Sequence, residues 1–127
     1  MSNAPTQLFG LVPLVRCTVR SAATGALTTT VTEDDSGTLF ISLTTGTHTY
    51  TLPAVANGKG KSWLFYDAET TAAMKVASTA ANFMGVDSAT GTVLTDGSYL
   101  GDCLLVIGDG TNYFGFVISG TWTSGAS

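Results

Sequence analysis

The chain has 127 residues, a formal net charge of −4, and only 11% charged against 44% hydrophobic residues. This length fits one domain. Five basic residues argue against nucleic-acid binding, which requires Lys and Arg to neutralise phosphates. No apolar run approaches the roughly 20 residues that span a bilayer, which argues against a membrane protein. The 22 threonines and 15 glycines are typical of strands joined by turns.

Residues 1–29 differ from the remainder. An apolar stretch, Leu8–Val15, is interrupted by Gly10 and Pro13 and has no basic region before it, so a secretory signal fits poorly. Two interpretations stay open: a first strand at Leu14–Val19 with a frayed end, or an extended arm that docks on a neighbour. Under the second interpretation, the candidate partner-binding residues are Leu8, Phe9, Leu11, Val12, Arg16 and Arg20.

Three successive acids stand in Glu33–Gly37. They invite a calcium interpretation, but the D-x-D-x-D-G spacing of a known calcium loop is absent. We therefore predict a turn in which a carboxylate accepts local backbone N–H groups, and no metal site.

The next stretch predicts a strand at Thr38–Leu43, a turn at Thr44–Thr47 and a second strand ending at Leu52. In the first strand, Leu39, Ile41 and Leu43 alternate onto one face. In the second, His48, Tyr50 and Leu52 share a face opposite the threonines. The pattern indicates a hairpin with one apolar and one hydroxyl-rich face.

Further strands are expected after Pro53. Ser62–Asp67 is apolar on both faces and should be covered on both sides. Phe83 and Met84 are expected to be core residues. The other expected elements are a loop over 68–75 leading into a strand at Met74–Ser78, a short strand at Thr92–Thr95, a hairpin of Cys103–Ile107 with Asn112–Ser119, and a flexible tail over 124–127.

Eight or nine short strands at this spacing predict an all-β fold, an antiparallel β-sandwich or barrel-like domain over residues 30–123. Two strands are apolar on both faces in a chain with few charges. We therefore expect a homo-oligomer, in which some of those residues pack against another subunit.

No catalytic constellation is evident. His48 is the only imidazole and alternates with Tyr50 onto an inward face, so we expect a core-edge histidine rather than part of a Ser–His–Asp relay. The aromatics Trp63, Tyr66, Tyr113 and Trp122 could form a sugar-stacking platform, but core positions are favoured. Buried free thiols are the first interpretation of Cys17 and Cys103, and a disulfide the second. We expect no enzyme activity, no cofactor and no metal.

Several motifs follow one another in a familiar order: Asp35-Ser36-Gly37, Tyr50-Thr51-Leu52-Pro53, the aromatic strand Trp63–Tyr66, Asp109-Gly110-Thr111 and Gly120-Thr121-Trp122. This D-S-G, L-P, D-G-T and G-x-W skeleton resembles small β-modules of tailed-bacteriophage virion proteins, including head-decoration (cement) proteins, head fibres and tail fibres. The resemblance covers roughly residues 30–123 and leaves residues 1–29 unexplained.

The resemblance implies a non-enzymatic component of the virion. It favours a protein that decorates the outer capsid surface, often as a trimer, and stabilises the capsid by clamping neighbouring major capsid subunits. The alternative is a receptor- or glycan-binding module of a head or tail fibre, which would use Trp63, Tyr66 or Trp122. The expected location is the outside of the virion.

Overall fold

The computed structural model describes residues 15–78, 83–84, 93–97 and 100–125. Strands dominate this part of the chain, and no helix in it is long and apolar enough to cross a membrane. The elements are β1 (Cys17–Ser21), β2 (Leu27–Thr30), η2 (Glu33–Asp35), β3 (Thr38–Ser42), β4 (His48–Thr51), η3 (Val55–Gly58), β5 (Ser62–Asp67), β6 (Met74–Ala77), β7 (Phe83–Met84), β8 (Val93–Asp96), β9 (Cys103–Gly108), β10 (Tyr113–Ser119) and β11 (Trp122–Gly125).

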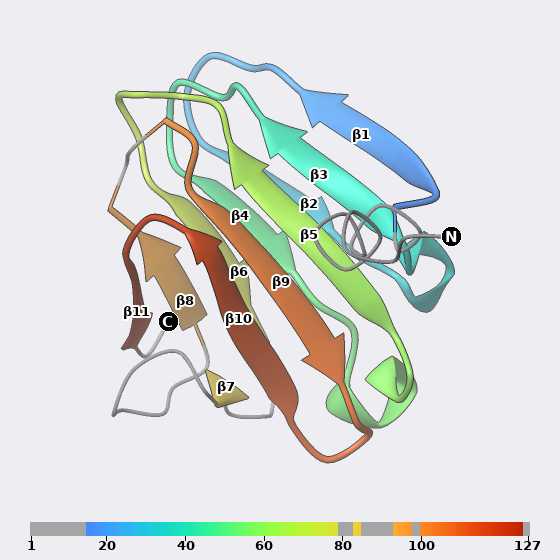
Figure 1. Ribbon diagram of the computed structural model, residues 1–127. Helices are drawn as coiled ribbons and strands as arrows, with labels where there is room; N and C mark the ends of the chain where they lie inside the picture. The colour runs from blue at the N-terminus through green and yellow to red at the C-terminus, as the bar shows by residue number, and fades with distance from the viewer. Residues whose placement is uncertain (1–14, 79–82, 85–92, 98–99, 126–127) are drawn as a thin grey trace, which may run out of the picture.

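The strands form two sheets that pack face to face as a sandwich (Figure 1). The six-stranded sheet has the order β1-β3-β5-β9-β10-β7, and the five-stranded sheet has the order β11-β8-β6-β4-β2. The all-β sandwich predicted from the sequence is confirmed.

Up to β6, successive strands alternate between the two sheets, so the backbone follows a superhelical path, which we call the coil. Strands β1, β3 and β5 lie parallel to one another in the six-stranded sheet, and β2, β4 and β6 lie parallel in the five-stranded sheet. The later strands pair antiparallel: β8 with β6 and β11, and β9 with β5 and β10. The exception is the short parallel pairing of β10 with β7. The sheets are therefore mixed, and the purely antiparallel arrangement expected from the sequence holds only for the later strands.

The hairpin predicted over 38–52 does not form, because β3 and β4 belong to different sheets. They face each other across the core, where the rings of Phe40 and Tyr50 are 5.2 Å apart. The predicted core face of the first strand is also wrong: Phe40 is buried between the sheets, while Leu39 and Ile41 point outward. Alternation alone could not decide this, since both faces of β3 carry large apolar side chains.

The second predicted hairpin is confirmed by the antiparallel pairing of β9 with β10. Its turn is held by the Asp109 carboxylate, which accepts the backbone N–H groups of Thr111 and Asn112 at 2.8 and 2.7 Å. The strand expected after the 68–75 loop is β6. Phe83 is a core residue as expected, whereas Met84 is 40% exposed, which corrects its assignment to the core.

Strand β1 overlaps the first strand considered at Leu14–Val19, and it pairs with β3 as part of the six-stranded sheet. The boundary drawn after residue 29 falls inside β2. At the other end, Ser124 and Gly125 belong to β11 and not to a tail. The arm residues Leu8, Phe9, Leu11 and Val12 lie outside the described residues.

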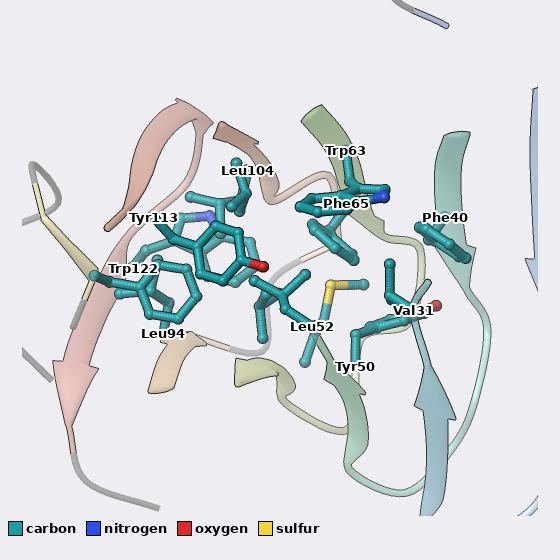
Figure 2. Packing of buried hydrophobic residues seen from close by; sticks show 14 residues of the cluster. Val31, Phe40, Tyr50, Leu52, Trp63, Phe65, Leu94, Leu104, Tyr113 and Trp122 are labelled. Atoms are coloured by element: carbon teal, nitrogen blue, oxygen red, sulfur yellow. The ribbon is translucent and has the colours of Figure 1, made fainter. Parts of the chain in front are cut away.

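Large apolar and aromatic side chains from both sheets fill the core (Figure 2). The ring of Phe65 lies 5.5 Å from Phe40 and 5.1 Å from Tyr50. Near the other end, Trp63 meets Tyr113 edge-on at 5.9 Å, and the Tyr113 hydroxyl donates to the Pro53 carbonyl at 2.7 Å. Burial of this kind supplies most of the free energy of folding.

Candidate docking surface

The far end of β10 presents a strip of apolar side chains to solvent. Phe116, Val117 and Ile118 are 48%, 40% and 45% exposed. Phe116 alternates with Gly115 onto the outer face, and the pairing with β9 shifts register between Val117 and Ser119, so Ile118 has no partner on β9. Val117 is exposed as well, although alternation would place it inward. We call these three residues the β10 strip.

In the part of the chain that the structure describes, the β10 strip also lies at an open edge of its sheet. Strand β7 pairs only with Tyr113 and Phe114, so among the described residues no strand pairs with the outer edge of β10 beyond Phe114. An exposed, apolar strand edge offers unpaired backbone groups as well as apolar side chains, and such edges are sites where another chain can add. The strip therefore combines the two features that a protein partner recognises.

The strip continues into an apolar row that crosses the outer face of the six-stranded sheet. Leu39 pairs with Leu64, Leu64 with Leu105, and Leu105 with Phe116. The neighbouring strand residues point inward and are buried, which leaves this alternate set facing outward. We call the whole set the outer apolar face: Leu39, Ile41, Leu64, Tyr66, Cys103, Leu105, Ile107, Phe114 and Phe116. The sequence prediction that β5 is apolar on both faces is confirmed.

A polar groove of about 440 Å³ lies near the start of β1. Arg16 and Lys61 line it together with Glu33 and Asp34. The Arg16 guanidinium donates from Nε and Nη2 to the Ser36 carbonyl at 3.2 and 2.8 Å. Of the predicted partner-binding residues, Arg16 therefore binds the segment before β1 to the Ser36 carbonyl, and Arg20 lies exposed on β1. The structure does not bring these two arginines together with the β10 strip.

His48 is buried in the core, 1% exposed, between hydroxyl groups of both sheets. Its Nδ1 lies 2.8 Å from Ser42 Oγ, and its Nε2 lies 2.7 Å from Thr29 Oγ1. Burial lowers the pKa of His48 to about 4, so the ring is neutral at pH 7. A neutral, enclosed imidazole that bridges two hydroxyls has a structural role, which is the inward position predicted from the sequence.

A group of buried carboxylates that was not predicted from the sequence lies where β5, β8 and β9 meet. Asp67, Asp96 and Asp102 are 1%, 5% and 3% exposed. Asp67 Oδ1 accepts the N–H of Glu69 at 2.9 Å, and Asp96 Oδ1 accepts the N–H of Met74 at 2.7 Å. Burial and a hydrogen bond shared with Asp96 raise the pKa of Asp67 to about 8, so Asp67 keeps its proton at pH 7. The three aspartates stand beside glycines, alanines or threonines in the sequence, like ordinary turn residues, and gave no signal.

The acidic turn has the predicted local role. Asp35 Oδ2 accepts the backbone N–H of Thr32 at 2.9 Å, and residues 33–35 form the 3-10 helix η2. In the part of the chain that the structure describes, no group of three or more His, Cys, Asp or Glu side chains is arranged to hold a metal ion.

The candidate sugar platform is not assembled. Trp63 and Trp122 are 1% and 3% exposed and belong to the core, as favoured from the sequence, whereas Tyr66 lies half-buried on the outer apolar face. Both cysteines are free thiols, which agrees with the first interpretation of the pair. The expectation that both thiols are buried is wrong. Cys17 is exposed on the edge strand β1, and Cys103 is half-buried on the outer apolar face.

Comparisons of the chain with family models, with curated proteins and with solved structures find no match.

Proposed function

We propose that this chain is a structural virion protein that decorates the outer surface of a bacteriophage capsid and stabilises it by binding neighbouring major capsid subunits. The motif order from Asp35 to Trp122 supports the virion assignment through the resemblance. The observation that carries the docking role is the β10 strip, which exposes three large apolar side chains where no strand among the described residues pairs with the edge of β10.

The chemistry of the surface supports adhesion. The chain carries few charges, so apolar and hydroxyl contacts dominate what a partner meets. Many copies on a repeating shell bind only the assembled lattice, and each bound copy favours the intact shell over the opened one. A stiff two-sheet body suits this role because it loses little conformational entropy on docking.

To test this proposal, capsid shells that lack the protein are mixed with the purified chain, and the mixture is then sedimented. We expect the chain to co-sediment and to raise the temperature at which the shells open. Replacing Phe116→Ser together with Ile118→Ser should weaken binding by tenfold or more, on the scale of about 1.4 kcal/mol.

Leu100→Ser provides the matched control, because Leu100 is the most exposed large apolar residue of the described chain at 59% and lies outside the strip. It should bind as the unaltered chain does. Full binding by the Phe116/Ile118 variant would remove the β10 strip from the docking surface, and failure of the unaltered chain to bind shells would overturn the proposed function.

We further propose that the protein acts as a homo-oligomer, with a trimer favoured. Light scattering at micromolar concentration should give a mass above that of one chain. A stable monomer on and off the shell would contradict this proposal. A glycan-binding fibre module is less favoured, because two of the three aromatics it would use are buried in the core.

A further inference from the structure

The segment between β4 and β5 contains an asparagine followed by a glycine, Asn57 and Gly58, inside the 3-10 helix η3. Asn57 is exposed, whereas Gly58 is buried. A Cβ at Gly58 would lie 2.5 Å from the hydroxyl oxygen of Tyr113, so only glycine fits against that ring. The packing of Tyr113 therefore requires a glycine directly after Asn57.

An Asn–Gly pair is chemically reactive. The backbone nitrogen of the glycine can attack the side-chain amide carbon of the asparagine, because glycine has no side chain to hinder the approach. A new C–N bond forms, the amide nitrogen leaves as ammonia with the proton lost by the glycine nitrogen, and a cyclic succinimide remains. Water then opens the ring at either carbonyl and gives aspartate or isoaspartate. Water is the only co-reactant, and nothing is oxidised or reduced.

The geometry of η3 keeps the two reacting groups apart. The backbone N–H of Asn57 donates to the Ala54 carbonyl at 2.9 Å, within a 3-10 turn. Residues in such a turn have ψ of about −20 to −30°. Closure of the succinimide ring requires ψ of Asn57 to rotate out of this range, so that the nitrogen of Gly58 turns toward the side chain. That rotation would move Gly58 out of its buried place.

Gly58 is held in that place from two sides. Its Cα faces the ring of Tyr113, and its carbonyl group packs against the Cα of Gly108, at the end of β9 beside which η3 lies (Figure 1). The Gly58 carbonyl also accepts the N–H of Lys61 at 3.0 Å. At the start of the segment, the Tyr113 hydroxyl donates to the Pro53 carbonyl at 2.7 Å. Tyr113 thus contacts both ends of the segment 53–58.

We propose that Asn57 is a site of spontaneous deamidation, and that the reaction proceeds only when η3 opens locally, away from Tyr113 and β9. The rate in the folded chain is then the rate of the unfolded sequence multiplied by the population of the open form. Isoaspartate lengthens the backbone by one carbon atom, so a modified turn no longer fits between Tyr113 and Gly108. The inference does not depend on the proposed capsid role, since it concerns the chemistry of the chain itself.

Peptide mapping by mass spectrometry tests the proposed site. The purified chain is incubated at mildly alkaline pH, folded or in urea, and the conversion of Asn57 is followed over time. In the folded chain we expect conversion about ten- to a thousandfold slower than in urea, because a minor state holds roughly 0.1–10% of the population. Equal rates would show that η3 does not restrict the reaction, and a complete lack of conversion in the folded chain would show that η3 does not open. Either result would overturn the proposal.

Two variants separate local opening from unfolding of the whole domain. Tyr113→Phe removes the bond to Pro53 and should accelerate conversion about 5- to 30-fold. Gly25→Ala is the matched control, because Gly25 has φ +87° and lies in the turn between β1 and β2, outside the segment 53–58. It should leave the rate unchanged.

Circular dichroism verifies that both variants are folded during the incubation. If Gly25→Ala accelerates conversion as much as Tyr113→Phe does, the reaction passes through global unfolding and the proposal is wrong. If Tyr113→Phe leaves the rate unchanged, Tyr113 does not keep η3 closed, and the proposal is wrong as well. Both outcomes are independent of whether the chain binds shells.

Discussion

The backbone N–H of Gly46 donates to the carbonyl oxygen of Gly25, 3.2 Å away, where two successive turns of the coil stack on each other. Each glycine lies between a strand of the six-stranded sheet and the next strand of the five-stranded sheet. The surrounding sequences match: Ser21–Thr28 and Ser42–Thr49 both have the form S-x-x-T-G-x-x-T. These two turns of the coil therefore correspond to a short repeat in the sequence, which the predicted hairpin over 38–52 does not account for.

Gly46→Ala should destabilise the fold by about 3 kcal/mol. A Cβ at this position would collide with the Gly25 carbonyl carbon and the Ala26 nitrogen, which are backbone atoms that cannot turn aside. Urea denaturation followed by circular dichroism measures the loss. Gly25→Ala is the matched comparison, because Gly25 has φ +87° but open space around it. It should cost about 1 kcal/mol through backbone strain alone. Equal losses for the two variants would contradict the stacking account.

Stability should fall between pH 6.5 and 8.5 because of Asp67. The unfolded carboxyl loses its proton near pH 3.8, whereas the pKa of folded Asp67 is raised to about 8. The folded state therefore holds an extra proton between these values, and stability declines as pH rises through them. His48 has the opposite effect, but only between its folded pKa of about 4 and its unfolded pKa of 6.5. Between pH 6.5 and 8.5 most of the decline comes from Asp67, because the pKa of Cys103, which burial raises from 9.0 to about 11, affects stability mainly at higher pH.

Asp67→Asn tests this slope, because an amide can replace a protonated carboxyl as acceptor from Glu69 and donor to Asp96. The melting temperature of the unaltered chain should drop by at least about 4 °C from pH 6.5 to 8.5. The Asn variant should show a much smaller drop, and Asp34→Asn, an exposed change, should keep the full drop. An unaltered slope in the Asp67 variant would contradict the assignment of the buried proton.

The side chain of His48 should stay neutral until well below pH 6. Its folded pKa is lowered to about 4 by burial, whereas an exposed histidine titrates near 6.5. Since the chain has a single histidine, one set of ring signals in an NMR pH titration reports it without assignment. The same titration in 8 M urea (about the concentration that unfolds small domains) provides the reference. A midpoint above 6 in the folded chain would show that the imidazole is reached by water.

Tyr113→Phe should cost about 1–2 kcal/mol. The change removes the hydroxyl that donates to the Pro53 carbonyl at 2.7 Å and leaves that acceptor without this bond, while the ring packing against Trp63 is kept. Tyr66→Phe, on the half-buried outer face, is the control and should cost less than half as much. Denaturant midpoints of the two variants, compared at equal slope, give the difference. If Tyr113→Phe leaves the free energy of unfolding unchanged, the hydrogen bond to Pro53 adds nothing to stability.

Much of the local structure followed from short-range physics. The alternation of Trp63 and Phe65 with Leu64 and Tyr66 placed β5 and showed that both of its faces are apolar. Asp109 and Gly110 predicted the turn of the last hairpin, because an Asx side chain and a residue with positive φ favour tight turns. The acidic residues 33–35 were assigned to a local turn for the same kind of reason.

The sequence by itself determined that the chain is all-β, where most strands lie, and that more apolar surface exists than one sheet face can bury. Only the tertiary structure decided that β3 and β4 face each other across the core, that Phe40 rather than Leu39 lies inside, and that three distant aspartates share one buried place. The reason is physical: a side-chain period of two fixes which residues share a face, but not which strand lies beside it. Partner choice depends on contacts between residues far apart in the chain, which a local pattern does not contain.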